Sequence, residues 1–149
     1  MALEKITGTE PEVSIGASSL TAESILEDFL AENFASIFPN LNLYEDSEGK
    51  GRQYPTDVGF IDLLATDKKT GDFVVMELKV GKTSDSVIGQ VLRYMGWVEE
   101  NLAKKAGTVR GIIIARELDE KLRYALRRTN GVEFYKYNIH FDVVPQKFN

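Results

Sequence analysis

Two acidic residues and one lysine in the middle of the chain have the types and spacing of a hydrolytic metal site. Asp62 lies inside the apolar run of residues 60–64, and Glu77 is followed by Leu78 and Lys79. Because side chains alternate along a strand, Glu77 and Lys79 would project from one face. A hairpin between the two runs would bring Asp62 beside Glu77. Two ionised carboxylates in an apolar setting repel each other and lose hydration, so the pair calls for a cation.

A hard divalent cation, Mg²⁺ or Mn²⁺, is the counter-charge that suits this pair. Mg²⁺ prefers oxygen ligands, binds through one or two carboxylates and keeps several waters. The predicted ligands are Asp62, Glu77 and the backbone carbonyl of Leu78. Lys79 would orient or help deprotonate the attacking water and stabilise the charge that develops on a phosphate. The alternative is an ion pair between Asp62 and Lys79 with Glu77 solvated at a strand end.

The following helix carries a polar and aromatic face. Gln90, Arg93, Tyr94 and Trp97 fall at positions i, i+3, i+4 and i+7, so they share one side of the helix. An amide, a guanidinium and two aromatic rings suit hydrogen bonding to a phosphate or to a metal-bound water. Packing on a sheet is the competing interpretation, above all for Tyr94 and Trp97.

The elements that must position these residues form a mixed pattern of helices and strands. Hairpin-linked strands come first and helix-linked strands later, which predicts an α/β fold with a mixed central β-sheet flanked by helices. In chain order, the apolar periodicity and the turn residues predict a helix from residue 21 or 24 to 38, a strand over 41–44, a polar loop over 45–57, strands over 59–66 and 73–80, a helix that Ser84 caps, a strand over 109–115, a helix over 117–129, and one or two strands within 132–144.

Length and composition indicate one globular domain. The chain has 149 residues, 43% of them apolar, and no cysteine, which excludes disulfides and thiolate zinc sites. Residues 1–20 are predicted to be a flexible arm or a linker remnant, and residues 21–149 the domain. No apolar run approaches the roughly 20 residues that span a bilayer, and the N-terminus lacks a signal-peptide pattern. We therefore expect a cytoplasmic protein that has no contact with membranes.

The net charge of −5 is unevenly distributed. Residues 1–50 hold two basic and ten acidic residues, whereas residues 51–149 hold 16 basic and 13 acidic ones. Two of those 13 acids, Asp62 and Glu77, would be offset by a bound cation. The C-terminal two-thirds of the chain can therefore face a polyanion, although an ordinary acidic surface is the other interpretation.

The segment from residue 59 to residue 100 resembles the nuclease core of the PD-(D/E)XK superfamily. More closely, it resembles the C-terminal catalytic domain of the NucS/EndoMS endonucleases. The motifs that carry the resemblance are G-x-I-D-L-L around Asp62, V-V-M-E-L-K ending at Lys79, and G-Q-V-L-R-Y-M containing Gln90 and Tyr94. The resemblance covers roughly residues 22–116, and it implies a restriction-endonuclease-like core of the order αβββαβ.

The resemblance also implies roles for individual residues. Asp62 and Glu77 would be metal ligands, Lys79 the catalytic lysine and Gln90 an auxiliary catalytic residue on the following helix. An acid on the first core helix of the family corresponds best to Glu27, a possible further ligand. Arg52 would match a basic loop position that enters the site, and together with Arg93 and Tyr94 it would contact the nucleic acid.

The expected function is that of a metal-dependent DNA endonuclease domain. The alternatives are a non-catalytic nucleic-acid-binding or assembly module that retains the nuclease fold, and a nuclease acting on RNA. NucS/EndoMS proteins carry a separate N-terminal DNA-binding domain, but only about 20 residues precede the first predicted helix, so a preference for mismatched or branched DNA is not carried over. The alternating tail over residues 132–144 could pair with a second copy at a sheet edge, which makes a homodimer possible.

Overall fold

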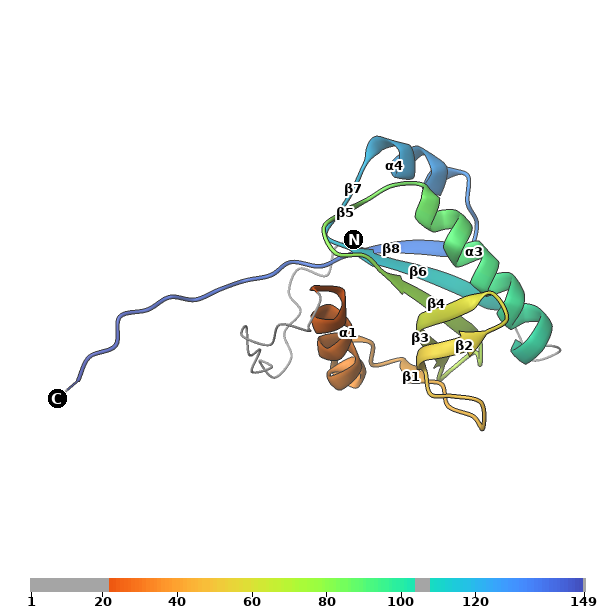
Figure 1. The fold of residues 1–149 in the computed structure, drawn as a ribbon, viewed down its shortest axis with the longest axis horizontal. Helices are drawn as coiled ribbons and strands as arrows, with labels where there is room; N and C mark the ends of the chain where they lie inside the picture. Colours follow the sequence, from red (N-terminus) through yellow and green to blue (C-terminus); the bar gives the residue numbers. More distant parts are fainter. Residues whose placement is uncertain (1–21, 104–107, 149) are drawn as a thin grey trace.

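The computed structural model describes residues 22–103 and 108–148, and the predicted arm of residues 1–20 lies outside them. Within the described part of the chain, six strands form one mixed sheet with helices on both faces (Figure 1). The elements are α1 (Ala22–Glu32), α2 (Phe34–Ile37), β1 (Leu41–Leu43), β2 (Arg52–Thr56), β3 (Gly59–Asp67), β4 (Phe73–Leu78), β5 (Lys82–Thr83), α3 (Ser86–Val98), the π-helical turn η1 (Glu99–Ala103), β6 (Val109–Ala115), β7 (Glu117–Leu118), α4 (Glu120–Arg127) and β8 (Val132–Lys136).

The strand order β1-β3-β4-β6-β8 combines an antiparallel half with a parallel half. β3 and β4 form the predicted hairpin, with Leu64 opposite Val75. β6 runs parallel to β4, and β8 runs parallel to β6, because α3 and α4 return the chain to the same end of the sheet before each strand. The predicted mixed sheet flanked by helices is therefore confirmed.

Helices cover both faces of the central strands, which explains why all six residues of β4 are buried. α1 and α2 pack on one face, where Leu26, Leu30 and Phe34 join a cluster with Val74 and Met76. α3 and α4 lie on the other side of the sheet (Figure 1). There the apolar side chains of α3 meet those of the strands in two clusters, which include Tyr54, Ile61, Leu64, Val75, Val91, Tyr94, Ile113 and Leu122.

The polar loop predicted over residues 45–57 is wrong in its second half, because Arg52–Thr56 forms β2 on the edge of β3. The only large apolar side chain of this strand, Tyr54, is 1% exposed and lies opposite Ile61. A strand with one buried side chain among polar ones gives little periodicity. Its pairing depends on the free edge of β3, which is a non-local feature.

Further boundaries differ from the predictions: the first predicted helix is divided into α1 and α2, and β4 ends at Leu78 instead of residue 80. Asp85, not Ser84, occupies the N-cap position of α3, and its side chain makes no capping hydrogen bond. α4 begins at Glu120, because Glu117–Leu118 pairs with β5 and Asp119 accepts a hydrogen bond from the Leu122 N–H as N-cap. Beyond β8 the tail forms no regular structure up to residue 148 and extends away from the body (Figure 1).

None of the helices in residues 22–103 and 108–148 has the length and apolar character to cross a membrane.

Candidate active site

Asp62 lies where the ladder between β3 and β4 ends. The last paired residues of this ladder are Leu63 and Met76, so Asp62 and Glu77 come next on the two strands. Here a side chain replaces the backbone as acceptor, because Asp62 Oδ2 accepts a 2.9 Å hydrogen bond from the Leu78 N–H. The end of the hairpin therefore fixes one oxygen of a carboxylate that is only partly buried.

Glu77 is the buried member of the acidic pair, with a relative exposure of 1%. Burial, followed by the charge and hydrogen bonding of Asp62, raises the pKa of the Glu77 carboxyl to about 9. With a pKa of about 9, the Glu77 carboxyl holds a proton at neutral pH in the metal-free chain. Its Oε1 is buried and has no hydrogen-bond partner among the described residues.

Lys79 follows β4 directly and is half-buried. Its backbone N–H donates to the Ile114 carbonyl at 2.8 Å, which ties it to the parallel neighbour β6. The positive charge of its ammonium group favours the ionised form of Glu77 and so opposes the rise of the Glu77 pKa. The structure therefore brings Asp62, Glu77 and Lys79 together, as expected from their spacing.

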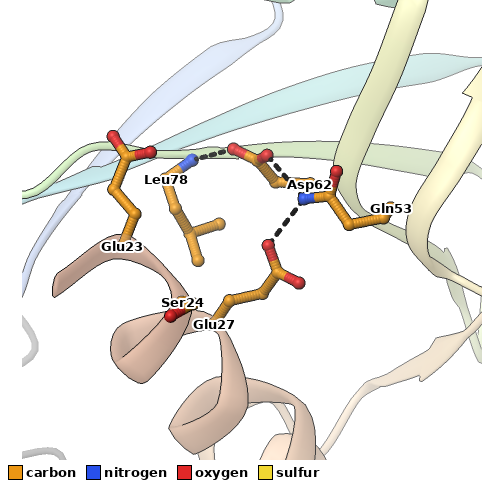
Figure 2. Close-up of a pocket in the computed structure, with 6 residues that line it drawn as sticks. All are labelled: Glu23, Ser24, Glu27, Gln53, Asp62 and Leu78. Carbon is orange, nitrogen blue, oxygen red and sulfur yellow. Dashed lines mark hydrogen bonds between the residues drawn. The ribbon is translucent and has the colours of Figure 1, made fainter. Parts of the chain in front are cut away.

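A pocket opens between α1 and the ends of these strands (Figure 2). Its lining residues are Glu23, Ser24, Glu27, Gln53, Asp62 and Leu78. Gln53 Nε2 donates to Glu27 Oε2 at 2.7 Å and to Asp62 Oδ1 at 3.1 Å. Glu27, 9% exposed, is thus linked to Asp62 through one amide group.

Arg52 lies at the start of β2 and is held by two acids of α1. Its Nε donates to Glu27 Oε1 at 2.7 Å, and a terminal nitrogen pairs with Asp28. The hydrogen bond to Glu27 is the main cause that raises the pKa of Arg52. Arg52 therefore contacts Glu27, one of the residues that line the pocket, but it comes from a strand, and two carboxylates compensate its charge.

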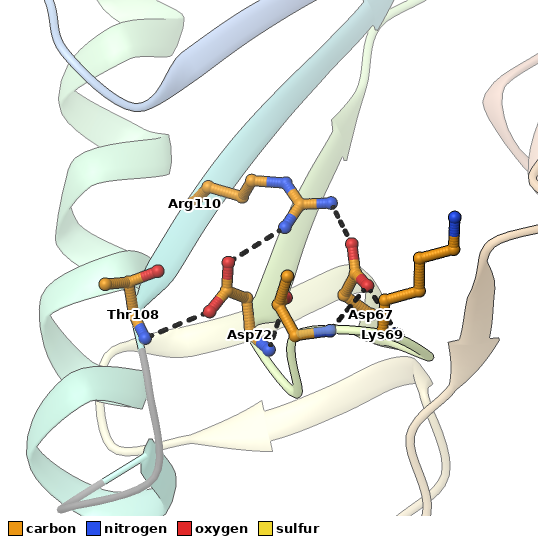
Figure 3. A network of polar contacts seen from close by, with 6 residues as sticks. Asp67, Lys69, Asp72, Thr108 and Arg110 are labelled. Atoms are coloured by element: carbon orange, nitrogen blue, oxygen red, sulfur yellow. Dashed lines mark hydrogen bonds and ion pairs between the residues drawn. The ribbon is translucent and has the colours of Figure 1, made fainter.

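A second network fixes the far end of the hairpin that carries both acids (Figure 3). The Arg110 guanidinium donates to Asp67 Oδ2 at 2.8 Å and to Asp72 Oδ2 at 3.1 Å. Asp67 Oδ1 accepts the N–H groups of Lys69 and Thr70. The Thr70 N–H and the Arg110 guanidinium hold the pKa of Asp67 well below its usual range. These contacts join the β3–β4 turn to β6, and so stabilise the register that places Asp62 beside Glu77.

The predicted polar face of α3 is divided between the core and the surface. Tyr94 is 4% exposed and packs against Gly59, and Trp97 Nε1 donates to Asp57 Oδ2 at 3.0 Å. Arg93 is exposed, with its guanidinium carbon 5.2 Å from the centroid of the Tyr94 ring. Gln90 is half-buried, and no hydrogen bond in the described part of the chain joins it to the acidic pair. The contacts of Gln90, Arg93 and Tyr94 with catalytic water or nucleic acid stay predictions.

The donor set fits a hard divalent cation held by two carboxylates. The partnerless Glu77 oxygen and the raised pKa of this carboxyl, which lies beside a second acid, fit a site that a cation would complete. In residues 22–103 and 108–148, no group of three or more acidic or histidine side chains gathers as a metal cluster. Such a cation would therefore keep several waters, as Mg²⁺ does.

Sequence reasoning did not find Gln53. The residue is not glycine, yet its φ is +51°, in the left-handed region that asparagine and glycine favour. A glutamine does not indicate a positive φ, and residue 53 lies in a segment that was predicted to be a loop. The proximity of Arg52 in the sequence was the only signal.

A mixed sheet with helices on both faces and an acidic pair where two of its strands part defines a restriction-endonuclease-like α/β fold. Residues 30–144 match the family model of the endonuclease NucS C-terminal domain, and the chain belongs to this family.

Relatives support this assignment in sequence and in structure. Endonuclease NucS of Pyrococcus furiosus is 34% identical over 107 residues, which are 71% of this chain and 38% of the relative. The crystal structure of a repair endonuclease from Pyrococcus abyssi has a TM-score of 0.62 and 28% identity, and covers 78% of this chain and 47% of that one. An EndoMS complex with double-stranded DNA shares the fold, with a TM-score of 0.63, 23% identity, and coverage of 89% of this chain and 50% of that one. This chain thus spans about two fifths of the length of its curated NucS relative and half or less of these solved structures.

The raised pKa of Glu77 predicts a pH-dependent stability in EDTA. The unfolded carboxyl titrates near its ordinary value of 4.5 and the folded one near 9. Folding takes up a proton between these values, so the free energy of unfolding should fall as pH rises through this window, by at most about 1.4 kcal/mol per unit. Glu77→Gln should remove this dependence and be the more stable protein at pH 9. Urea unfolding at several pH values measures the effect.

The matched control is Glu32→Gln at the exposed end of α1. This variant should keep the pH dependence of the wild type. Parallel pH profiles for wild type and Glu77→Gln would show instead that Glu77 is ionised in the folded, metal-free chain.

Proposed function

We propose that this chain is a divalent-cation-dependent DNA endonuclease domain that hydrolyses phosphodiester bonds. The observation that carries the proposal is the buried Glu77 beside Asp62 and Lys79, at the strand ends of a chain that belongs to the NucS C-terminal family. The curated relatives are named endonucleases. One relative in fold was solved in complex with double-stranded DNA, and DNA is therefore the polymer we propose.

The cation is Mg²⁺ or Mn²⁺, and the residues that would hold it are Asp62, Glu77 and the backbone carbonyl of Leu78. When bound, such an ion lowers the pKa of a coordinated water and stabilises negative charge on the phosphate. Its binding would release the proton that Glu77 holds, because both carboxylates must then be ionised. Glu27 lines a pocket together with Asp62 and Leu78, and both of its oxygens already accept hydrogen bonds, so we place it outside the set of ligands.

The chain's own cations and amides would position the substrate. Lys79 is half-buried, so its ammonium group would act in a medium of lower polarity than water and would hold a phosphate oxygen more strongly. Gln90 on α3 would orient the attacking water. Arg93 is exposed on the same helix and would contact the nucleic-acid backbone, as would Arg52 at the start of β2 and Tyr94, whose side chain is 4% exposed.

A non-catalytic binding module is the alternative from another class. Such a module gains nothing from a buried carboxyl group beside a second acid, because burial of a carboxylate without a partner is costly. The intact set of Asp62, Glu77 and Lys79 therefore favours catalysis. A nuclease that acts on RNA would use the same set, so substrate choice needs an assay.

Asp62→Asn and Lys79→Met should each abolish cleavage while the chain stays folded. In Asp62→Asn the amide oxygen can still accept the Leu78 N–H and the charge beside Glu77 is gone, which offsets the lost hydrogen bond from Gln53 Nε2. The stability of this variant in EDTA should therefore stay close to that of the wild type. Loss of activity should exceed about 100-fold, because even outer partners of a metal ligand contribute 10- to 100-fold. The measurement is cleavage of single-stranded, duplex, mismatched and branched DNA and of RNA, with Mg²⁺, Mn²⁺ or EDTA.

Arg123→Met is the matched control, since Arg123 pairs with Glu120 on the exposed side of α4 and should leave cleavage unchanged. Activity of the wild type in EDTA, or of Asp62→Asn with Mg²⁺, would contradict the proposal. Binding without cleavage of any substrate would favour the non-catalytic module, and unfolding of Asp62→Asn would make Asp62 half of a structural pair.

We also propose a homodimer, because the tail after β8 exposes apolar side chains at alternating positions. Ile139, Phe141 and Val143 are 61%, 77% and 94% exposed. β8 is the last strand of the sheet, and an unpaired strand edge next to an apolar segment invites pairing with a second copy. Light scattering at micromolar concentration should give the mass of two chains. A measured mass of one chain, both with and without DNA, would contradict the homodimer.

A further inference from the structure

We propose that Gln53 is a positioning residue for the Asp62 carboxylate, and that Glu27 acts on the site through Gln53 without touching the cation. This inference rests on the proposed cation site at Asp62 and Glu77. It assigns two residues of the pocket to a hydrogen-bonded chain that runs from α1 across β2 to β3.

The Asp62 carboxylate is held at both of its oxygens. Its Oδ2 accepts the Leu78 N–H at 2.9 Å, and its Oδ1 accepts Gln53 Nε2 at 3.1 Å (Figure 2). A donor at each oxygen restrains rotation of the carboxylate, and one lone pair on each oxygen is left for other partners. Without Gln53, Oδ1 would lose this amide donor and the carboxylate would be freer to rotate.

Glu27 and Glu77 differ in how their oxygens are satisfied. Both oxygens of Glu27 accept hydrogen bonds of 2.7 Å, one from Arg52 Nε and one from Gln53 Nε2. Arg52 also supplies Glu27 with a counter-charge. Glu77, in contrast, has a buried oxygen without a partner among the described residues. The cation is therefore needed at Glu77, whereas Glu27 is already satisfied and serves as an anchor for the Gln53 amide.

The backbone of Gln53 is held in an unusual conformation. A φ of +51° is uncommon for a residue other than glycine, asparagine or aspartate, and it persists only where the surroundings enforce it. Here the pairs Arg52–Leu63 and Tyr54–Ile61 hold β2 on both sides of Gln53. The strained residue is also the one whose side chain reaches two carboxylates of the pocket, as expected for a constraint that serves the site.

The test is the affinity for Mn²⁺, measured by electron paramagnetic resonance without nucleic acid. Gln53→Gly accepts the positive φ and removes the amide, and Gln53→Asn tolerates it but is one methylene too short. Both should bind Mn²⁺ about 10- to 100-fold more weakly than the wild type. Gln146→Gly, the same change in the exposed tail, should bind like the wild type. The thermal midpoint of Gln53→Gly in EDTA should stay equal or rise, because glycine removes the strain.

A double-mutant cycle separates an anchor from a ligand. If Glu27 acts through Gln53, Glu27→Gln should weaken Mn²⁺ binding by no more than Gln53→Gly does. The double variant Glu27→Gln/Gln53→Gly should then lose no more Mn²⁺ affinity than Gln53→Gly alone does. Losses that multiply in the double variant would make Glu27 a direct ligand and overturn the inference.

The readout also distinguishes this inference from the proposed function. Suppose that the wild type binds Mn²⁺ but cleaves no nucleic acid, and that the variants lose Mn²⁺ affinity as expected. This result would refute the nuclease function and leave the role of Gln53 intact. A wild type that cleaves, with Gln53→Gly and Gln53→Asn binding Mn²⁺ normally, would overturn the role of Gln53 alone. A wild type without any Mn²⁺ binding would overturn both.

Discussion

The burial of Glu77 beside Asp62 is the interaction on which the rest of the site depends. A carboxyl group that is 1% exposed and next to a second acid is held in its protonated form, with a pKa of about 9. A protein gains no stability from this arrangement in its ionised form, because burial and repulsion both oppose it. A bound cation would remove both costs, so the pair suits a cation site. The Lys79 ammonium group would add a second positive charge beside that cation.

The sheet produces this environment by its topology. Helices on both faces remove water from β4, and the parallel neighbour β6 fixes the backbone of Lys79. The hairpin of β3 and β4 opens at Asp62, where a carboxylate takes the place of a backbone acceptor. Arg110 ties the other end of the hairpin to β6 through Asp67 and Asp72. The acidic pair is therefore set by elements distant from it in sequence.

Sequence patterns were sufficient for the parts that depend on local chemistry. Asp62 and Glu77 were visible as acids within apolar strands, and the hairpin and the helix-linked strands followed from periodicity. β2 and Gln53 were not predictable, since the pairing of a polar strand and a left-handed glutamine depend on the edge of β3 and on α1. The end of regular structure after Lys136 has the same cause, because no strand of the described chain lies beside the alternating tail.

If the acidic pair binds a divalent cation, Glu77 must give up its proton when that cation binds. Calorimetric titration with Mn²⁺ near neutral pH, in two buffers of different ionisation enthalpy, counts the protons released on binding. We expect about one proton per ion for the wild type, because the pKa of Glu77 lies near 9 before binding. We expect none for Glu77→Gln, whatever affinity that variant keeps. Binding by the wild type without proton release would contradict a cation site at Glu77.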